Sequence, residues 1–508
     1  MAAGAEEGTI EEIRESPPWL WVPLATALVY LLAFTIPYWL PAHYLHVQDE
    51  LFQFAARQPW RGVLFYAALA AVLGLYLYAY RRLWRRPAAH RPGILAIGLW
   101  TALFCLLLIP VQPITSSDVY GYAFQGRIVA VLGQNPFVHL YRDFAGDPFY
   151  FIVTFRHLPA STGYGPLWIL VDAALGWLAR NGLLVNLLLF KTLAAGLHLA
   201  ASLLVYAILG RTAPERRLAG TLFYAWNPLL LYELVVNAHN DAALAALALL
   251  GFFFLSRRRG LLAVPCLAAA ALVKPVALLW LPPVALWLLA RERDWPARAR
   301  RALWIAALAL LPAVLAYAPF WQGADTFQGL LAQSNISGNS LPALLIQLGR
   351  ALWPVAGAGP DSVVVQGVKL LTAVLFAPFY LWQMWLAWRA GAGASLAGLV
   401  RVSFDLMLFY LLFVGFQFWP WYLTWLLVPA ALLPAAGPAQ LGPWRRRLSL
   451  ALCASTPLLY FPFGWQWARQ NLPPWSVALL AALPLLGLAL WAIARYRRPA
   501  EVEQSPQP

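Results

Sequence analysis

A polar passage with the sequence TSSDVYGYAFQGRI, which follows an apolar segment, holds the residues that could best do chemistry. Its one carboxylate, Asp118, could serve as a general base. The serines before it also fit a helix N-cap, an alternative structural role. Tyr120, Tyr122, Arg127 and Asn135 follow closely, a mixture that is uncommon in a passive connector. We therefore predict that Asp118 is catalytic and that Tyr120, Tyr122 and Asn135 bind a ligand.

A second polar group, His239-Asn240-Asp241, lies at the tip of a tight hairpin, directly before an apolar run. Ionisable residues at membrane depth are costly and usually mark functional sites. An Asn/Asp pair that caps the following helix is the alternative, and capping is compatible with function. We predict catalytic roles for His239 and Asp241, with His239 orienting a phosphate or the base, and a binding role for Asn240.

Cations and aromatic rings complete the candidate set. Lys274 interrupts the otherwise uncharged stretch 261–290, so it must reach the interface, a carboxylate or an anionic ligand. With Arg127 and Arg156 it could bind a phosphate. The dense aromatic cluster around WPWY offers platforms for a sugar ring or a lipid chain, although interfacial belts also collect such residues. The binding candidates in this cluster are Trp419, Trp421 and Tyr422.

The elements that position these residues are membrane helices. Of 508 residues, 62% are hydrophobic and 11% charged, against roughly 25% charged in soluble domains. A helix needs about 20 residues to cross a bilayer, and apolar runs of nearly this length recur along the chain. We predict an all-α polytopic membrane protein with about 12 to 14 transmembrane helices. Residues 19–495 would form one domain between cytoplasmic tails, 1–18 (disordered) and 496–508.

Short arginine clusters between the apolar runs predict the orientation. The net charge of +15 comes largely from these clusters, which follow the positive-inside pattern, so nucleic-acid binding is excluded. The passage 113–163 then becomes an extracytoplasmic loop bearing the catalytic carboxylate. Between it and the next cluster lie two apolar runs, 165–179 and 183–210, where an odd number of crossings is required. Either one run is re-entrant or the second is a broken pair.

Several short motifs resemble the GT-C superfamily, and more closely the bacterial polyprenol-phosphate-mannose-dependent α-1,6-mannosyltransferases. They are DVYGY…GR…NPF, YGPLW from Tyr164, NPLLLYELVVNAHNDA, KPVAL from Lys274, and PWYLTW. The resemblance implies a GT-C-type bundle with short helices in its outer loops, in the bacterial plasma (inner) membrane. It also implies a polyprenyl-phosphate-mannose donor, an oligosaccharide or glycolipid acceptor, and Asp118 as the base on the extracytoplasmic side. Under this resemblance, the residues that would bind the sugar, the acceptor or the lipid include Tyr120, Tyr122, Asn135, Tyr164 and Asn240.

The expected reaction is an inverting transfer, because one attack on a β-linked donor gives an α-linked product. A GT-C transferase of another sugar or acceptor is one alternative. A lipid-linked-sugar flippase or transporter is another, although the ionisable residues gather at one face instead of the midplane. The sequence contains no Walker motif, which argues against ATP-driven transport. No cofactor or metal ligand set is assigned, but Asp118 and Asp241 could share a divalent cation.

Overall fold

The computed structural model describes residues 20–45, 58–85, 93–154, 162–333, 336–354, 359, 362–433, 444–460 and 471–497. The described residues form helices joined by short connections, with isolated β-bridges in place of any strand. The predicted tails lie outside the described residues, except for 496–497. The predicted all-α polytopic membrane class is confirmed, because the helices that follow are long and apolar.

Five of the described helical segments are long and apolar enough to cross a bilayer. They are α4 Pro59–Arg85, α8 Leu183–Thr212, α14 Trp295–Tyr317, α17 Val363–Ala392, and α18 Leu396–Phe409 continued by the π-helix η11 Tyr410–Val414. The outer helices α14 and α17 expose large apolar side chains such as Leu310, Val314 and Leu370. Such side chains are stable in lipid and costly in water, so these faces contact the bilayer.

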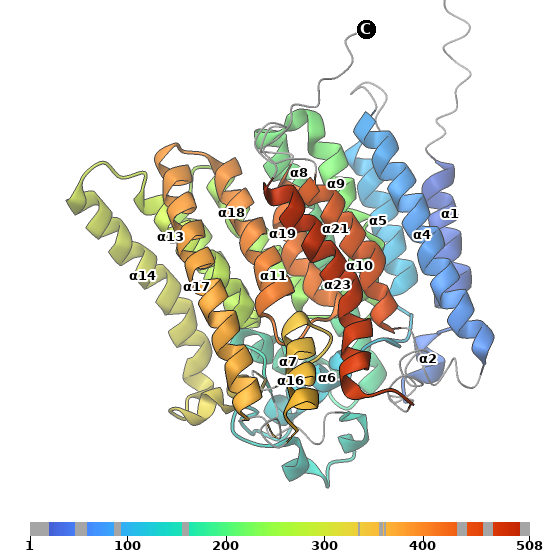
Figure 1. Cartoon of the computed structure of the whole chain (residues 1–508). Helices are drawn as coiled ribbons and strands as arrows, with labels where there is room; N and C mark the ends of the chain where they lie inside the picture. The colour runs from blue at the N-terminus through green and yellow to red at the C-terminus, as the bar shows by residue number, and fades with distance from the viewer. Residues whose placement is uncertain are drawn as a thin grey trace, which may run out of the picture.

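Shorter apolar helices pack among the long ones (Figure 1). They are α1 Trp21–Val29 with η2 Tyr30–Thr35, α5 Ile94–Leu108, α7 Pro166–Ala179, α11 Asp241–Ser256, α12 Gly260–Val273, η8 Pro275–Trp280 with α13 Leu281–Leu289, α16 Leu341–Leu352, η12 Pro420–Tyr422 with α19 Leu423–Leu432, and α23 Pro474–Arg497. The remaining elements include α2 Leu40–His43, α6 Asp118–Ala130, α9 Arg217–Ala225, α10 Pro228–Leu230, η7 Leu231–Val236, α15 Gln328–Gln333 and α21 Trp444–Ser455.

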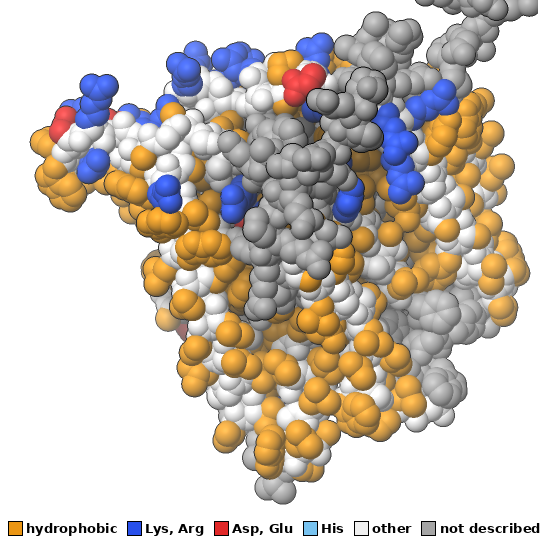
Figure 2. Space-filling view, turned by 45° about the horizontal axis from the view of Figure 1, so that its top comes forward, with side chains coloured by type: hydrophobic (Ala, Val, Ile, Leu, Met, Phe, Trp, Pro, Cys, Tyr) orange, Lys and Arg blue, Asp and Glu red, His pale blue; other side chains and the backbone are white. Residues whose placement is uncertain are grey.

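Basic side chains gather at one end of the bundle. Figure 2 shows Lys and Arg concentrated there, above a surface rich in hydrophobic side chains. Contacts between turns tie this end together: Arg211 donates to the Ser256 carbonyl, and Arg216 donates to the Trp84 carbonyl. Helices α6, α7 and α16 lie at the opposite end (Figure 1). The bundle therefore has one arginine-rich end and one end built from short helices.

The structure excludes one of the two interpretations of the crossings between residues 163 and 211. The run 183–210 lies within one continuous helix, α8 Leu183–Thr212, of 30 residues, so the interpretation of a broken pair is wrong. Helix α7 has 14 residues, about 21 Å at 1.5 Å per residue, against a hydrocarbon core of about 30 Å, a length that agrees with the re-entrant interpretation. It packs on α6, where a Cβ on Gly126 would lie 2.1 Å from the Asp172 carbonyl oxygen. Only glycine permits this approach.

Two backbone features position Lys274 and His239 near the start of α6. The Gly165 amide donates to the Val273 carbonyl at 3.1 Å, which anchors the start of α7 beside the residue before Lys274. The π-helix η7 ends just before Ala238, whose φ of 55° is unusual for a residue with a side chain. π-helical turns frequently occur at functional sites, and this one precedes His239.

Candidate active site

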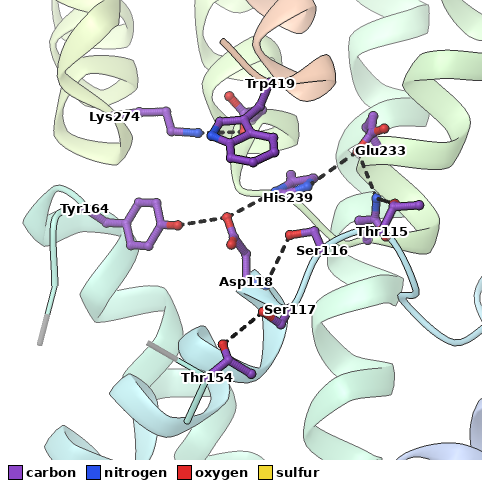
Figure 3. A network of polar contacts seen from close by, with 12 residues as sticks. Thr115, Ser116, Ser117, Asp118, Thr154, Tyr164, Glu233, His239, Lys274 and Trp419 are labelled. Carbon is purple, nitrogen blue, oxygen red and sulfur yellow. Dashed lines mark hydrogen bonds and ion pairs between the residues drawn. The ribbon is translucent and has the colours of Figure 1, made fainter. Parts of the chain in front are cut away.

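Asp118 is the first residue of α6, where the helix dipole favours a negative charge. The Tyr164 hydroxyl donates to its Oδ2 at 3.0 Å, and His239 Nδ1 lies 3.5 Å from the same oxygen (Figure 3). Its own amide donates to the Ser116 hydroxyl at 3.2 Å. The Asp118 side chain remains 11% exposed, so a substrate can reach this carboxylate.

His239 lies between two carboxylates. Its Nε2 is 3.5 Å from Glu233 Oε2, opposite the contact with Asp118. Glu233 is buried on η7 and accepts hydrogen bonds from Asn237 Nδ2 at 2.8 Å and from the Tyr460 hydroxyl at 3.1 Å. The Trp421 ring stacks on the imidazole at 4.1 Å. The ring of His239 is therefore fixed in position and aimed at Asp118.

Lys274 forms the cationic side of the site. It lies in extended backbone between α12 and η8, and its Nζ is 2.8 Å from Asp241 Oδ2. The other oxygen of Asp241 accepts from the Trp425 indole. The Lys274 ammonium also lies 5.3 Å and 5.5 Å from the ring centroids of Tyr422 and Trp425. Lys274 is 13% exposed, whereas Asp241 is fully buried, so the ammonium is the group of this pair that a ligand can reach.

The ionisation of the site follows from these contacts. Burial disfavours the imidazolium, but the carboxylates of Asp118 and Glu233 outweigh it and raise the pKa of His239 to about 9. Burial also disfavours the Asp118 carboxylate, but His239, Lys274 and Tyr164 outweigh it and hold the pKa of Asp118 below its usual value. At neutral pH the site therefore contains an ionised Asp118 beside an imidazolium.

Two buried polar side chains face this cluster without partners among the described residues. The Asn240 amide is fully buried, and neither its oxygen nor its nitrogen has a hydrogen-bond partner there. It does not cap α11, although it stands at the N-cap position. Buried polar groups are rarely left unpaired, so this amide is available to a ligand or a water molecule. Tyr122 packs edge-on against Tyr164 at 5.1 Å, between the cluster and α8.

Three predicted site residues within the described part of the chain are not brought to Asp118. Arg127 lies nine residues further along α6 and pairs with Asp147 at 2.9 Å, so we no longer assign it to the donor phosphate. Asn135 donates to the Phe320 carbonyl, and the Tyr120 hydroxyl accepts from Gln112. Both therefore have structural partners. Arg156 lies outside the described residues.

The comparisons with known proteins agree with one another. Residues 20–291 match the family model described as alpha-(1->6)-mannopyranosyltransferase, N-terminal domain. The chain belongs to this family. A probable alpha-(1->6)-mannopyranosyltransferase of Mycolicibacterium smegmatis is 25% identical, covering 73% of this chain and 69% of the relative. Alpha-(1->6)-mannopyranosyltransferase A of Mycobacterium tuberculosis is 26% identical, covering 72% and 70%. The protein is therefore a membrane mannosyltransferase.

Sequence reasoning missed one residue of this mannosyltransferase site. Glu233 is an acidic residue inside the apolar run 228–236, and the rule that singled out Lys274 applies to it equally. Its contacts with His239, Asn237 and Tyr460 could not be read from the sequence, since Tyr460 is 227 residues away. The sequence therefore marks Glu233 as unusual, but it does not reveal that Tyr460 is its partner.

We expect Glu233→Gln to shift the pH dependence of the mannosyltransferase. Removing one of the two carboxylates beside His239 lowers the pKa of its imidazolium, which is about 9 in the wild type. The alkaline limb of kcat/KM should move toward neutral pH. Because the folded pKa lies above the unfolded value of about 6.5, the stability gained from this charge is present below pH 6.5. It is lost as the pH rises through about 9.

The measurements are kcat/KM and thermal unfolding across the neutral and alkaline range, in the same detergent. Glu292→Gln is the matched control, because Glu292 pairs with Arg301 at the arginine-rich end. An alkaline limb that stays in place in Glu233→Gln would show that Glu233 does not set the charge of His239.

Proposed function

We propose that this mannosyltransferase moves mannose from polyprenyl-phosphate-mannose to a hydroxyl of a glycan or glycolipid, with inversion and formation of an α-1,6 linkage. The reaction would occur on the extracytoplasmic side of a bacterial plasma membrane. The observation that carries the proposal is one reachable carboxylate, Asp118, within a buried cluster that also presents the Lys274 ammonium. The donor lipid and the linkage are the parts that this proposal adds to the family assignment.

Exposure favours Asp118 as the base. Three carboxylates occupy the cluster, and their side chains are 11%, 1% and 0% exposed at Asp118, Glu233 and Asp241. Both oxygens of Asp241 are already bonded, and those of Glu233 accept from Asn237 and Tyr460. Asp118 alone among these three can meet an acceptor hydroxyl. Its low pKa is tolerable, because a hydroxyl becomes strongly acidic as its oxygen bonds to the anomeric carbon.

In the proposed step, the acceptor oxygen forms a bond to the anomeric carbon while the bond from that carbon to the phosphate oxygen breaks. Asp118 takes the hydroxyl proton, and the phosphate leaves with the bonding electron pair. Lys274 and the His239 imidazolium stabilise the charge that grows on the phosphate. The phosphate leaves as a stable anion, so no general acid is required. A single attack on a β-linked donor inverts the anomeric centre.

Aromatic side chains would hold the sugar and the lipid. Trp419 stacks on Trp421 at 5.2 Å and 3°, and Trp421 stacks in turn on His239. Trp419 is only half-buried, so one face of this column of rings is available to a sugar. We propose that the buried Asn240 amide, together with Tyr122, Tyr164 and Tyr422, contacts sugar hydroxyls or the lipid.

Sidedness is supported by the distribution of charge. Arginine-rich loops remain in the cytoplasm during membrane insertion. The basic side chains gather at one end of the bundle (Figure 2), and α6, which begins at Asp118, lies at the other (Figure 1). The donor phosphate would therefore be at the extracytoplasmic surface, with its polyprenyl chain among the lipid-facing helices.

The product of a defined reaction tests this function. Purified protein is given polyprenyl-phosphate-mannose, labelled in the sugar, and an oligomannoside acceptor. We expect free polyprenyl phosphate and an acceptor that is one hexose heavier and sensitive to an α-1,6-mannosidase. If the labelled donor only moves between the leaflets of a vesicle and no polyprenyl phosphate is released, the protein is a flippase and the transferase proposal is wrong.

The same assay in excess chelator tests the divalent cation. Among the described residues, no group of three or more His, Cys, Asp or Glu side chains could hold a metal ion. Asp241 is bonded to Lys274 and Trp425, so it is not free to share an ion with Asp118. We propose that Lys274 supplies the positive charge and expect turnover to persist in the chelator. Loss of turnover that Mg²⁺ or Mn²⁺ restores would contradict this.

A further inference from the structure

Two fully buried polar side chains of α8, Lys191 and His198, lie on the same face of the helix. They are two turns apart, a spacing that places residues on one helical stripe. The proposed reaction uses neither of them. A polar side chain buried inside a membrane bundle is costly unless its donors find acceptors. Both side chains find them on the helical segment 217–236, which packs beside α8.

The segment 217–236 is interrupted where His198 contacts it. Helix α9 ends at Ala225, and α10 begins at Pro228. In a continuous α-helix the Leu229 amide would donate to the Ala225 carbonyl, but it donates to the Asn227 side chain at 3.1 Å. His198 Nε2 lies 3.0 Å from the Ala225 carbonyl oxygen. The side chain on α8 therefore supplies the contact that the interruption removes.

Lys191 makes the same kind of contact at the end of η7. In a continuous α-helix the His239 amide would donate to the Val235 carbonyl, but it donates to the Glu233 carbonyl at 3.3 Å. The side-chain nitrogen of Lys191 donates to the Val235 carbonyl at 3.0 Å and also to the Val236 carbonyl. Basic side chains commonly bind the last carbonyls of a helix in this way. Lys191 thus fixes the last two residues of η7.

The turn that follows η7 sets the position of His239. Only two residues separate Val236 from His239, and one of them, Ala238, has a φ of 55°. Strained backbone of this kind persists only where the surrounding contacts fix it. The turn places the imidazole 3.5 Å from both Asp118 and Glu233 (Figure 3). If the end of η7 were released, the imidazole would move relative to both carboxylates.

We propose that Lys191 is a positioning residue for mannose transfer, which holds the end of η7 and thereby fixes His239 beside Asp118. The inference rests on the proposed function, which assigns His239 to the leaving phosphate. It adds a residue that acts through the backbone of η7 and not by contact with the substrate. A lysine side chain has at least two N–H donors whether or not it is charged, so this role needs no particular protonation state.

Hydrogen–deuterium exchange tests the contact without any substrate. Lys191→Met and His198→Leu are a matched pair, because each removes a buried contact between α8 and the segment 217–236. In Lys191→Met we expect the amides of residues 237–244 to exchange roughly tenfold faster, the effect of losing one or two hydrogen bonds. In His198→Leu these amides should be unchanged, and the faster exchange should occur at residues 226–230.

Kinetics of the same variants separate positioning from a loss of stability. In Lys191→Met we expect kcat to fall by about 10 to 10²-fold with little change in the KM of the donor, since misplacement by about 1 Å has an effect of this size. The alkaline limb of kcat/KM should move toward neutral pH, because the imidazole leaves the carboxylates that raise its pKa. Lys191→Arg keeps N–H donors in nearly the same volume and should restore both. His198→Leu should lower the unfolding temperature and leave the alkaline limb in place.

If Lys191→Met does not give folded protein, Lys191→Gln, which keeps an N–H donor, takes its place with the same expected directions. Unchanged exchange at residues 237–244, or an equal rise there in His198→Leu, would overturn the proposal. Faster exchange with unchanged kcat and alkaline limb would also overturn it, because Lys191 would then serve stability alone. If the wild type transfers no mannose, faster exchange confined to residues 237–244 still supports the contact, while the proposed function falls.

Discussion

Asp118→Asn should lower the turnover of mannose transfer by about 10² to 10⁴-fold, the usual contribution of a general base. The amide has the size of the carboxylate and can still accept from Tyr164, so the fold and the position of α6 are retained. It cannot take up the proton of the acceptor hydroxyl. Donor binding should remain within a few-fold of the wild type, because Lys274 and the aromatic column are unchanged.

The measurements are single-turnover rates with labelled donor and equilibrium binding of the donor to each protein. Asp143→Asn is the matched control, since Asp143 is an exposed carboxylate in the same passage and lies outside the cluster. If the turnover of Asp118→Asn stays within threefold of the wild type, a group other than Asp118 acts as the base. Equal loss of activity in the control would mean that the passage as a whole had been disturbed.

Lys274→Met should lower kcat by about 10² to 10³-fold through loss of the charge that faces the leaving phosphate. It should also destabilise the protein, because the fully buried Asp241 would lose its cationic partner. Breaking a buried ion pair from one side costs about 3 to 5 kcal/mol. Loss of activity in this variant therefore has two possible causes, and a second substitution separates them.

The double variant Lys274→Met, Asp241→Asn removes the stranded charge, while residue 241 can still accept from the Trp425 indole. Its unfolding temperature should recover toward the wild type, whereas its turnover should remain low. Recovery of both stability and turnover would reduce Lys274 to a structural partner of Asp241. Lys369→Met on α17 is the control for loss of a lysine outside the site.

Local sequence patterns were informative where one residue type has few stable environments. The apolar runs identified the membrane class, because an uncharged run of that length is stable in lipid. Asp118, His239 and Lys274 stood out for a related reason: an ionisable group beside such a run needs a partner or a function. Glu233 satisfies the same rule, although it lies inside an apolar run and not at a polar tip between two runs.

Other features depended on partners far away in the chain. Arg127 and Lys274 are both basic residues near the predicted outer surface, yet Asp147 engages one and Asp241 the other. The first pairing holds Arg127 away from the catalytic candidates, and the second leaves an ammonium near Asp118. No local sequence pattern distinguishes Arg127 from Lys274, because the carboxylate that pairs with each depends on how α6, α7 and α12 pack.

The sequence by itself determined the class of the protein, the sidedness of its charges and the identity of its catalytic candidates. Each of these depends on the transfer energy of short segments between water and lipid. The tertiary structure decided that α8 is one unbroken helix, that Glu233 and Asp118 hold His239 between them, and that Asp118 is the most exposed of the three carboxylates. These features arise from contacts between helices distant in the chain, and their burial exists only once the bundle has packed.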